Sequence, residues 1–205
     1  RIIRGNDAVI AAPGTAAVLE GPDAGLKFEE APLAEVLHTV LREIAKVNYV
    51  VHPPLNGTLT LSTKGSISID YAMLLLEDAL QANGYQLIVD PRGTYHVGRP
   101  EVLKGIVPSV RQVVKNTPLA PGAGVVIVPL KYIGAAEMAT ILRPIAPADA
   151  ILRVDTVRNL LVLAGSRGQA EGWLDMVATF DVDLLKGMSV GVFPLKFISA
   201  KDVDY

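Results

Sequence analysis

The 205-residue sequence contains no cysteine, which excludes disulfides, thiol catalysis and thiolate metal sites. It also lacks any apolar run close to the roughly 18 residues that a membrane-spanning helix needs. Its net charge is −2, whereas nucleic-acid binders usually carry a basic surplus, so DNA or RNA is disfavoured as the main partner. Half of the residues are hydrophobic, which is enough to bury real cores and excludes a disordered segment.

The first residues show no basic, apolar and small-residue pattern of a signal peptide. Because the chain starts at Arg1, we expect a mature or trimmed sequence. Residues 1–24 are rich in Ala, Gly and Pro, and we predict that they form a leader arm.

A first domain is predicted over residues 25–98, with the order β-α-β-β-α-β-β. Asp70 is the expected N-cap of its second helix over 71–82, and the turn at 90–93 closes a hairpin. The first helix has an apolar face at helical spacing, made of Leu33, Val36, Leu37, Val40, Leu41 and Ile44. The order predicts a small sheet covered by two helices.

Residues 99–124 are punctuated by prolines and are predicted to be a linker with one strand at 106–110. A second domain follows at 125–184 with the order β-α-β-β-α. Ser166 and Gln169 have the spacing of a capping box, which predicts the start of its last helix. Trp173 lies on the apolar face of that helix and is expected in the core.

An internal repeat is the most informative feature of the sequence. The segment Val-Pro-Leu-Lys-Tyr-Ile at 128–133 recurs as Phe-Pro-Leu-Lys-Phe-Ile at 193–198, an offset of 65 residues. A fixed period indicates tandem copies of one supersecondary unit. We therefore expect residues 190–205 to be the truncated start of a third domain. The predicted fold class is α+β, with two small β/α sandwich domains in tandem and the start of a third.

These segments resemble the secretins, the outer-membrane channels of bacterial secretion, in ordered succession over residues 25–205. The first domain is similar to the short N-terminal (N0-type) domain that secretins share with TonB-dependent receptors. The second is similar to the KH-like ring (N1-type) domain. The residues that carry the resemblance are Leu26-Lys27-Phe28, 33–37, Asn48 to Pro53, Gly57 to Leu61, 128–133, the turn Asp155 to Asn159 with Leu160-Leu161-Val162, and Phe180-Asp181-Val182. The type II secretion version fits best.

The resemblance implies a homo-oligomeric outer-membrane channel that exports folded proteins, with this part in the periplasm. Its partners would be copies of itself in a ring, the inner-membrane platform protein of the secretion system and the secreted cargo. Exposed strand edges of the first domain are the expected docking sites for the platform, near Leu26, Lys27, Phe28, Thr58, Leu59, Thr60 and Leu61. For Lys131 and Lys196 two interpretations stay open: a contact at the ring interface, or simple solvation.

No catalytic, metal or cofactor site is predicted. His38, His52 and His96 lie 14 and 44 residues apart without a ligand spacing, so zinc is not expected. Acidic pairs such as Glu29-Glu30 and Glu77-Asp78 are expected to be solvated charges. No nucleophile elbow, Walker loop or dinucleotide fingerprint is present, and the chain is not expected to be an enzyme.

Two alternatives from other classes remain. Gly165-Ser166-Arg167-Gly168 is a G-x-x-G with a basic residue, which would clamp nucleic acid in a KH protein. In KH proteins, however, that loop joins two helices, whereas here it joins a predicted strand to a helix, which favours a structural use. The other alternative is a periplasmic signalling domain like that of a TonB-dependent receptor. The 65-residue repeat speaks against it, because such receptors do not continue with ring-domain copies.

Overall fold

The structure is a computed structural model that describes residues 19, 21–113 and 118–183. Most of the expected leader arm and the expected start of a third domain at 190–205 lie outside the described residues, as does the second copy of the repeat. Within these described ranges, no helix is both long and apolar enough to cross a membrane.

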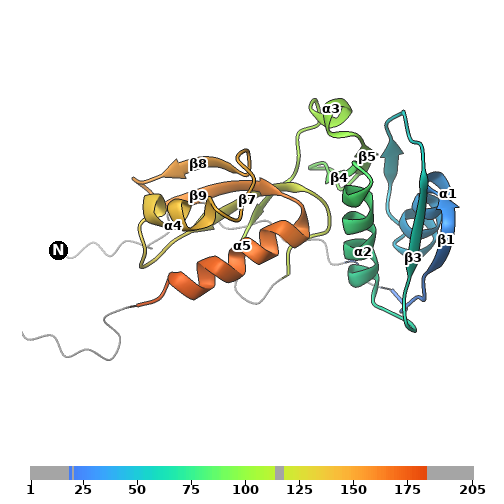
Figure 1. Cartoon of the computed structure of the whole chain (residues 1–205), viewed down its shortest axis with the longest axis horizontal. Coiled ribbons are helices and arrows are strands. Elements are labelled where there is room, and N and C mark those ends of the chain that lie inside the picture. Colours follow the sequence, from blue (N-terminus) through green and yellow to red (C-terminus); the bar gives the residue numbers. More distant parts are fainter. Residues whose placement is uncertain (1–18, 20, 114–117, 184–205) are drawn as a thin grey trace, which may run out of the picture.

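The first half of the described chain, up to residue 98, contains two small sheets (Figure 1). β1 pairs antiparallel with β3, and a second sheet has the order β2-β5-β4 with β2 parallel to β5. The predicted order of elements is confirmed, because α1 continues directly into a π-helix, η1. The elements are β1 (Lys27–Pro32), α1 (Leu33–Leu37), η1 (His38–Ile44), β2 (Tyr49–Val51), β3 (Thr58–Ser62), α2 (Ile69–Ala82), β4 (Gln86–Val89) and β5 (Tyr95–Gly98).

The start of α2 differs from the prediction. Ser68 is the N-cap, and its side chain accepts a hydrogen bond from the Tyr71 N–H at 3.3 Å. The prediction of Asp70 as the cap is therefore wrong by two residues. Because Ser68 already caps the helix, the Asp70 carboxylate in the first turn is free for another partner.

α2 packs against η1, β3 and β4 through one apolar face. Ile69, Met73, Leu76 and Leu80 recur at helical spacing and are at most 3% exposed. They join the side chains of α1, η1 and the strands in one hydrophobic core. α2 is thus fixed by burial on one face, while its other face is turned toward the second half of the chain.

The second half forms a four-stranded sheet of order β6-β7-β9-β8. The predicted order β-α-β-β-α is confirmed by β7, α4, β8, β9 and α5. The strand expected at 106–110 lies instead at 110–112, and it pairs parallel with β7. Part of the expected linker is thus built into this sheet. The elements are α3 (Pro100–Leu103), β6 (Val110–Gln112), β7 (Gly124–Pro129), α4 (Ala135–Leu142), β8 (Ile151–Asp155), β9 (Leu160–Gly165) and α5 (Arg167–Phe180).

α4 and α5 cover one face of this sheet and form a second hydrophobic core with it. Val126 lies opposite Leu163 and Val128 opposite Leu161, so the four side chains point to the same face. Trp173 is 4% exposed and lies in this core, which confirms the prediction. The two cores have no buried residue in common.

The two halves lie side by side, with α2 of the first half close to the start of α5 (Figure 1). Two backbone hydrogen bonds join the edge of β4 to the chain that leads into the second sheet. Ser109 N–H donates to the Val89 carbonyl at 2.8 Å, and Ala123 N–H donates to the Leu87 carbonyl at 2.6 Å. The seam between the halves is therefore continuous with the edge of a sheet.

Candidate interdomain clamp and docking surfaces

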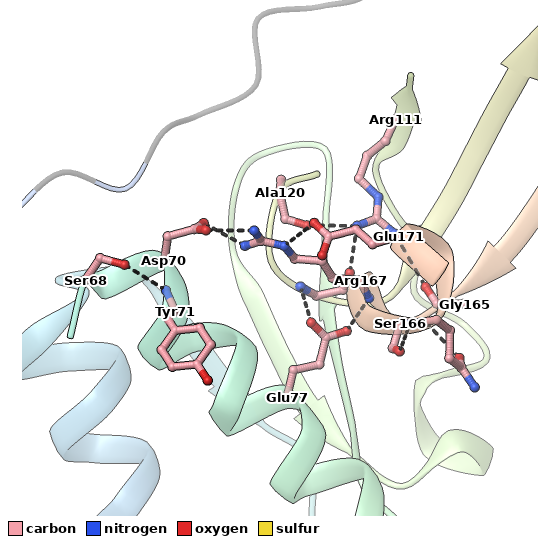
Figure 2. A network of polar contacts seen from close by, with 12 residues as sticks. Ser68, Asp70, Tyr71, Glu77, Arg111, Ala120, Gly165, Ser166, Arg167 and Glu171 are labelled. Atoms are coloured by element: carbon pink, nitrogen blue, oxygen red, sulfur yellow. Dashed lines mark hydrogen bonds and ion pairs between the residues drawn. The ribbon is translucent and has the colours of Figure 1, made fainter. Parts of the chain in front are cut away.

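A buried carboxylate of the first half holds the second half. Glu77 of α2 is 2% exposed, and its two oxygens accept hydrogen bonds from the backbone N–H groups of Arg167 at 2.9 Å and Gly122 at 3.0 Å (Figure 2). Arg167 is the first residue of α5, where backbone N–H groups have no partner within the helix. A negative charge is also favoured there by the helix dipole. Glu77 thus completes the amino end of a helix in the other half.

The Arg167 side chain in turn binds a residue of α2. Its guanidinium donates to both oxygens of Asp70 at 2.6 and 2.7 Å, and its Nε donates to Glu171 at 2.8 Å. The Arg167 side chain is 5% exposed, and that of Asp70 is 40% exposed. Such two-pronged arginine–carboxylate pairs fix direction as well as distance. We call Asp70, Glu77, Arg111, Arg167 and Glu171 the polar clamp.

Arg111 of β6 holds the loop that presents Gly122. Its guanidinium donates to the carbonyls of Ala120 at 2.8 Å, Gly122 at 2.9 Å and Gly165 at 3.4 Å. Its buried Nε has no hydrogen-bond partner among the described residues. One arginine therefore ties the chain before β7 to the end of β9, next to the start of α5 (Figure 2).

Burial and hydrogen bonding move the pKa values of the clamp in opposite directions. Burial raises the pKa of Glu77 and outweighs the opposing effects of the Arg167 and Gly122 N–H groups and the nearby Arg111 charge. Burial also lowers the pKa of Arg111. For Arg167, burial acts to lower the pKa, but the hydrogen bonds to Asp70 and Glu171 outweigh it and raise the pKa.

The expectation that Glu77 is a solvated charge is wrong. Met73 and Leu80 are buried on the same helix, four residues before and three residues after Glu77. Helical spacing therefore puts Glu77 at the border of the buried face, and this signal was in the sequence. Its partners were not, because they lie 45 and 90 residues further along the chain.

The Gly165–Gly168 segment joins β9 to α5, as the structural interpretation predicted. The Ser166 side chain accepts from the Gln169 N–H at 3.2 Å, and the Gln169 side chain accepts from the Ser166 N–H at 3.1 Å, which confirms the capping box. A side chain at Gly168 would come within 3.4 Å of the Asp78 carboxylate. Because the Arg167 guanidinium is already paired with Asp70 and Glu171, it is not free to bind a nucleic-acid backbone.

The predicted docking residues come together on two paired strands. β1 and β3 form a two-stranded sheet in which Lys27 is opposite Ser62, Phe28 opposite Leu61 and Pro32 opposite Thr58. Leu26, Leu59 and Leu61 are 2%, 5% and 8% exposed and point into the core. Lys27, Thr58 and Thr60 are exposed, and Phe28 is partly buried. Only the second group, and the strand edges, are accessible to a partner.

Lys131 is exposed and lies in the loop after β7. The backbone N–H groups of Lys131, Tyr132 and Ile133 all donate to the Asp181 carboxylate, at 2.7 to 3.1 Å. The repeated Pro-Leu-Lys-aromatic-Ile segment therefore has a structural use, since it forms a cradle of N–H groups for an aspartate at the end of α5. Lys196 lies outside the described residues.

His52 and His96 are 44 residues apart in the sequence but are neighbours in the structure. His52 Nε2 lies 3.0 Å from His96 Nδ1, and His96 Nε2 lies 3.5 Å from the Asp90 carboxylate. β2 and β5 run parallel, with Val51 opposite Val97, which brings the two rings together. Among the described residues, no three His, Cys, Asp or Glu side chains are grouped so that they could hold a metal ion. His38 is exposed near Tyr49 and Glu43.

A cavity of about 360 Å³ lies beside the clamp, between β4 and β7. Its walls come from both halves and include Gln81, Gln86, Pro108, Pro147, Asp149 and Gln169. Glu77 borders it, so the cavity and the clamp belong to one interdomain seam.

Comparisons with known proteins agree with this architecture. The sequence profile of the GspD-like N0 domain matches residues 26–97. Secretin XpsD of Xanthomonas campestris pv. campestris is 37% identical over 202 residues, which are 97% of this chain and 26% of that protein. The chain thus spans about a quarter of the length of this curated relative.

One of the similar solved structures supports a shared fold. The Klebsiella pneumoniae type II secretion system outer membrane complex, with PulD, PulS and the PulC HR domain, matches 86% of this chain and 30% of that chain. Its TM-score is 0.55 at 19% identity. The N-terminal domain of the secretin XcpQ from Pseudomonas aeruginosa matches 78% of this chain and 66% of that chain, with a TM-score of 0.36 at 13% identity. Residues 26–97 therefore match the N0 domain of GspD-like proteins, and almost the whole chain is similar in sequence to part of a secretin.

Proposed function

We propose that this chain is the periplasmic part of a homo-oligomeric outer-membrane channel that exports folded proteins by type II secretion. The observation that carries the proposal is the 37% identity to secretin XpsD over 97% of the chain, which extends through both halves. The profile match at 26–97 supports the assignment of the first half as an N0 domain. The proposal gives the chain a binding and assembly role and assigns it no reaction.

We further propose the predicted domain division: a leader arm at 1–24, N0 at 25–98, a linker at 99–124 whose strand β6 joins the sheet of the next domain, a ring domain at 125–184 and the start of another ring domain at 190–205. The two separate hydrophobic cores support a division between the second and fourth of these segments. Small cores of this kind gain further stability when subunits pack in an assembly.

The first half would dock the inner-membrane platform through the open edges of β1 and β3. In the described chain these strands pair only with each other, so each has one edge with unpaired backbone groups. Such edges accept an added strand from a partner. The Klebsiella structure of similar fold contains the HR domain of PulC, so a PulC counterpart is the partner we propose here.

The second half would line the vestibule as one of several stacked rings, with Lys131 at the contact between neighbouring subunits. Its exposed side chain and its place in the repeated segment support this role. Of the two alternatives, nucleic-acid binding is disfavoured because Arg167 is paired and buried. A TonB-receptor-like signalling role has no specific observation in its favour.

Site-specific crosslinking tests both contacts. A photoreactive residue at Lys27 or Thr58, introduced into the full-length protein in its own cell, should capture the PulC counterpart. The same residue at Lys131 should capture a second copy of this protein. Arg42, which is exposed on η1, is the matched control and should capture neither. Capture at Arg42 with equal yield, or no capture at Lys27 and Thr58, would contradict the docking proposal.

A further inference from the structure

We propose that the polar clamp holds the two halves of this chain in one fixed orientation, with Arg167 as its positioning residue. The two halves would then move as one rigid body. This inference does not depend on the secretion proposal, since it concerns only contacts within the chain.

The clamp attaches α5 to α2 at two separate places. Asp70 binds the Arg167 guanidinium, while Glu77 binds the backbone of Arg167 and Gly122. Asp70 and Glu77 are two helical turns apart, which corresponds to about 10 Å along α2. A single contact would leave the halves free to rotate about it. Two contacts at this separation, one of them two-pronged, fix the angle as well (Figure 2).

Burial makes the clamp selective for one orientation. The residues Glu77 and Arg167 are 2% and 4% exposed. A small rotation that kept the halves in contact would leave one of these charges buried without its partner, which costs far more than the pair gains. Full separation would let water reach both groups. Intermediate orientations are therefore the unfavourable ones, and the closed orientation is sharply defined.

Close backbone approaches around the clamp also favour one orientation of the two halves. Gly122 has a φ of +100°, and a Cβ there would lie 2.9 Å from a Val89 methyl group. Gly168 passes near Asp78 and Leu74 of α2. At these two positions the absence of a side chain lets the halves come close enough for the clamp to form.

Distances between spin labels test the inference directly. The chain has no cysteine, so Arg42→Cys on η1 and Ala136→Cys on α4 introduce two unique label sites, both exposed and one in each half. Measurements use the full chain. The labelled parent should give one narrow distance distribution, and Arg167→Ala should broaden it and shift it to longer distances. Arg143→Ala removes an exposed arginine of the same half and should leave the distribution narrow.

Asp70→Asn provides a second, milder variant, because the Asp70 side chain is 40% exposed and lies outside both hydrophobic cores. We expect it to broaden the distribution as well, with an unchanged circular dichroism spectrum. The Gly122 and Arg167 N–H groups reach Glu77 only while the halves are held together, so in Asp70→Asn their amide hydrogen exchange should become about 10-fold faster or more. A broad distribution in the parent, or an unchanged one in Asp70→Asn and in folded Arg167→Ala, would overturn the inference.

Discussion

The Glu77 carboxylate and the Arg167 backbone N–H lie 2.9 Å apart across 90 residues of sequence. One is on the helix that anchors the first hydrophobic core, and the other starts the helix that closes the second. This contact links the protonation of Glu77 to the junction between the two halves.

Glu77→Gln should make this coupling visible as a pH dependence. Burial raises the folded-state pKa of Glu77 above its ordinary value of 4.5, so the folded chain binds a proton more tightly than the unfolded chain. The contribution of Glu77 to stability is therefore fully present below pH 4.5 and decreases as pH rises through the folded-state pKa. The free energy of unfolding of the parent, minus that of Glu77→Gln, should therefore fall as the pH rises above 4.5.

Urea unfolding at several pH values measures this difference. Because glutamine offers one acceptor oxygen where glutamate offers two, Glu77→Gln also leaves either Gly122 or Arg167 facing an amide donor. Glu35→Gln, at an exposed position of α1, is the control and should show no such pH trend. A difference that rises with pH would mean that hydrogen bonding to the charged form dominates over burial.

Asp155→Asn should show the opposite pH dependence. The Asp155 carboxylate accepts from the Arg158 and Val157 N–H groups and lies near two arginines. The Arg158 N–H contributes most to lowering its pKa below the ordinary value of 3.8. Its stabilisation is present above pH 3.8 and is lost as pH falls through the folded-state pKa. Asp155→Asn should therefore be less stable than the parent at pH 7, and the two should converge in acid. A difference in free energy of unfolding between the parent and Asp155→Asn that stays constant down to pH 2 would contradict this.

Gly165→Ala should destabilise the second half by about 1–3 kcal/mol, the usual cost of overpacking a core. A Cβ at residue 165 would lie 2.6 Å from the Trp173 ring, which is buried in the second hydrophobic core. Trp173 is the chain's single tryptophan, so its fluorescence reports the loss of stability. Gly172→Ala is the matched control. It is exposed on α5 with nothing within 4 Å and should gain about 0.5–1 kcal/mol from helix propensity.

Replacing Asn159 by alanine or by glycine should destabilise the chain, and alanine should destabilise it more. It has a φ of +51°, and its side chain bonds the Ala135 N–H and the carbonyls of Leu130 and Ile133. Both variants lose these three bonds, at a cost of about 2–4 kcal/mol. Alanine also pays about 1 kcal/mol for the left-handed backbone, which glycine adopts freely. Equal unfolding midpoints for the two variants would show that the backbone conformation carries no strain.

Local signals in the sequence predicted much of the fold. The Ser166–Gln169 capping box and the apolar faces of α1–η1 and α5 depend on neighbours within a few turns, and the structure has them at the predicted positions. Asp70 was misassigned because it and Ser68 are both good N-cap residues close to one helix start. The segment at 110–112 could not be recognised as a sheet strand, because β7, its strand partner among the described residues, follows it across the proline-rich stretch.

The clamp and the histidine pair were beyond local reasoning. Arg167 and Asp70 are 97 residues apart, and His52 and His96 are 44 apart. Their meeting depends on how two finished units dock, or on a parallel strand pairing, and neither leaves a spacing in the sequence. The residues predicted for docking were expected in strands, and the fold shows that Leu26, Leu59 and Leu61 point inward whereas Lys27 and Thr60 are exposed.

Imaging the full-length protein that carries this chain, purified from outer membranes, tests the central claim most directly. Single-particle electron microscopy should show closed rings of identical subunits, with the fold of residues 21–183 repeated around each ring and the N0 domain farthest from the membrane. A monomer in the membrane, or an assembly in which these residues form no ring, would contradict the account.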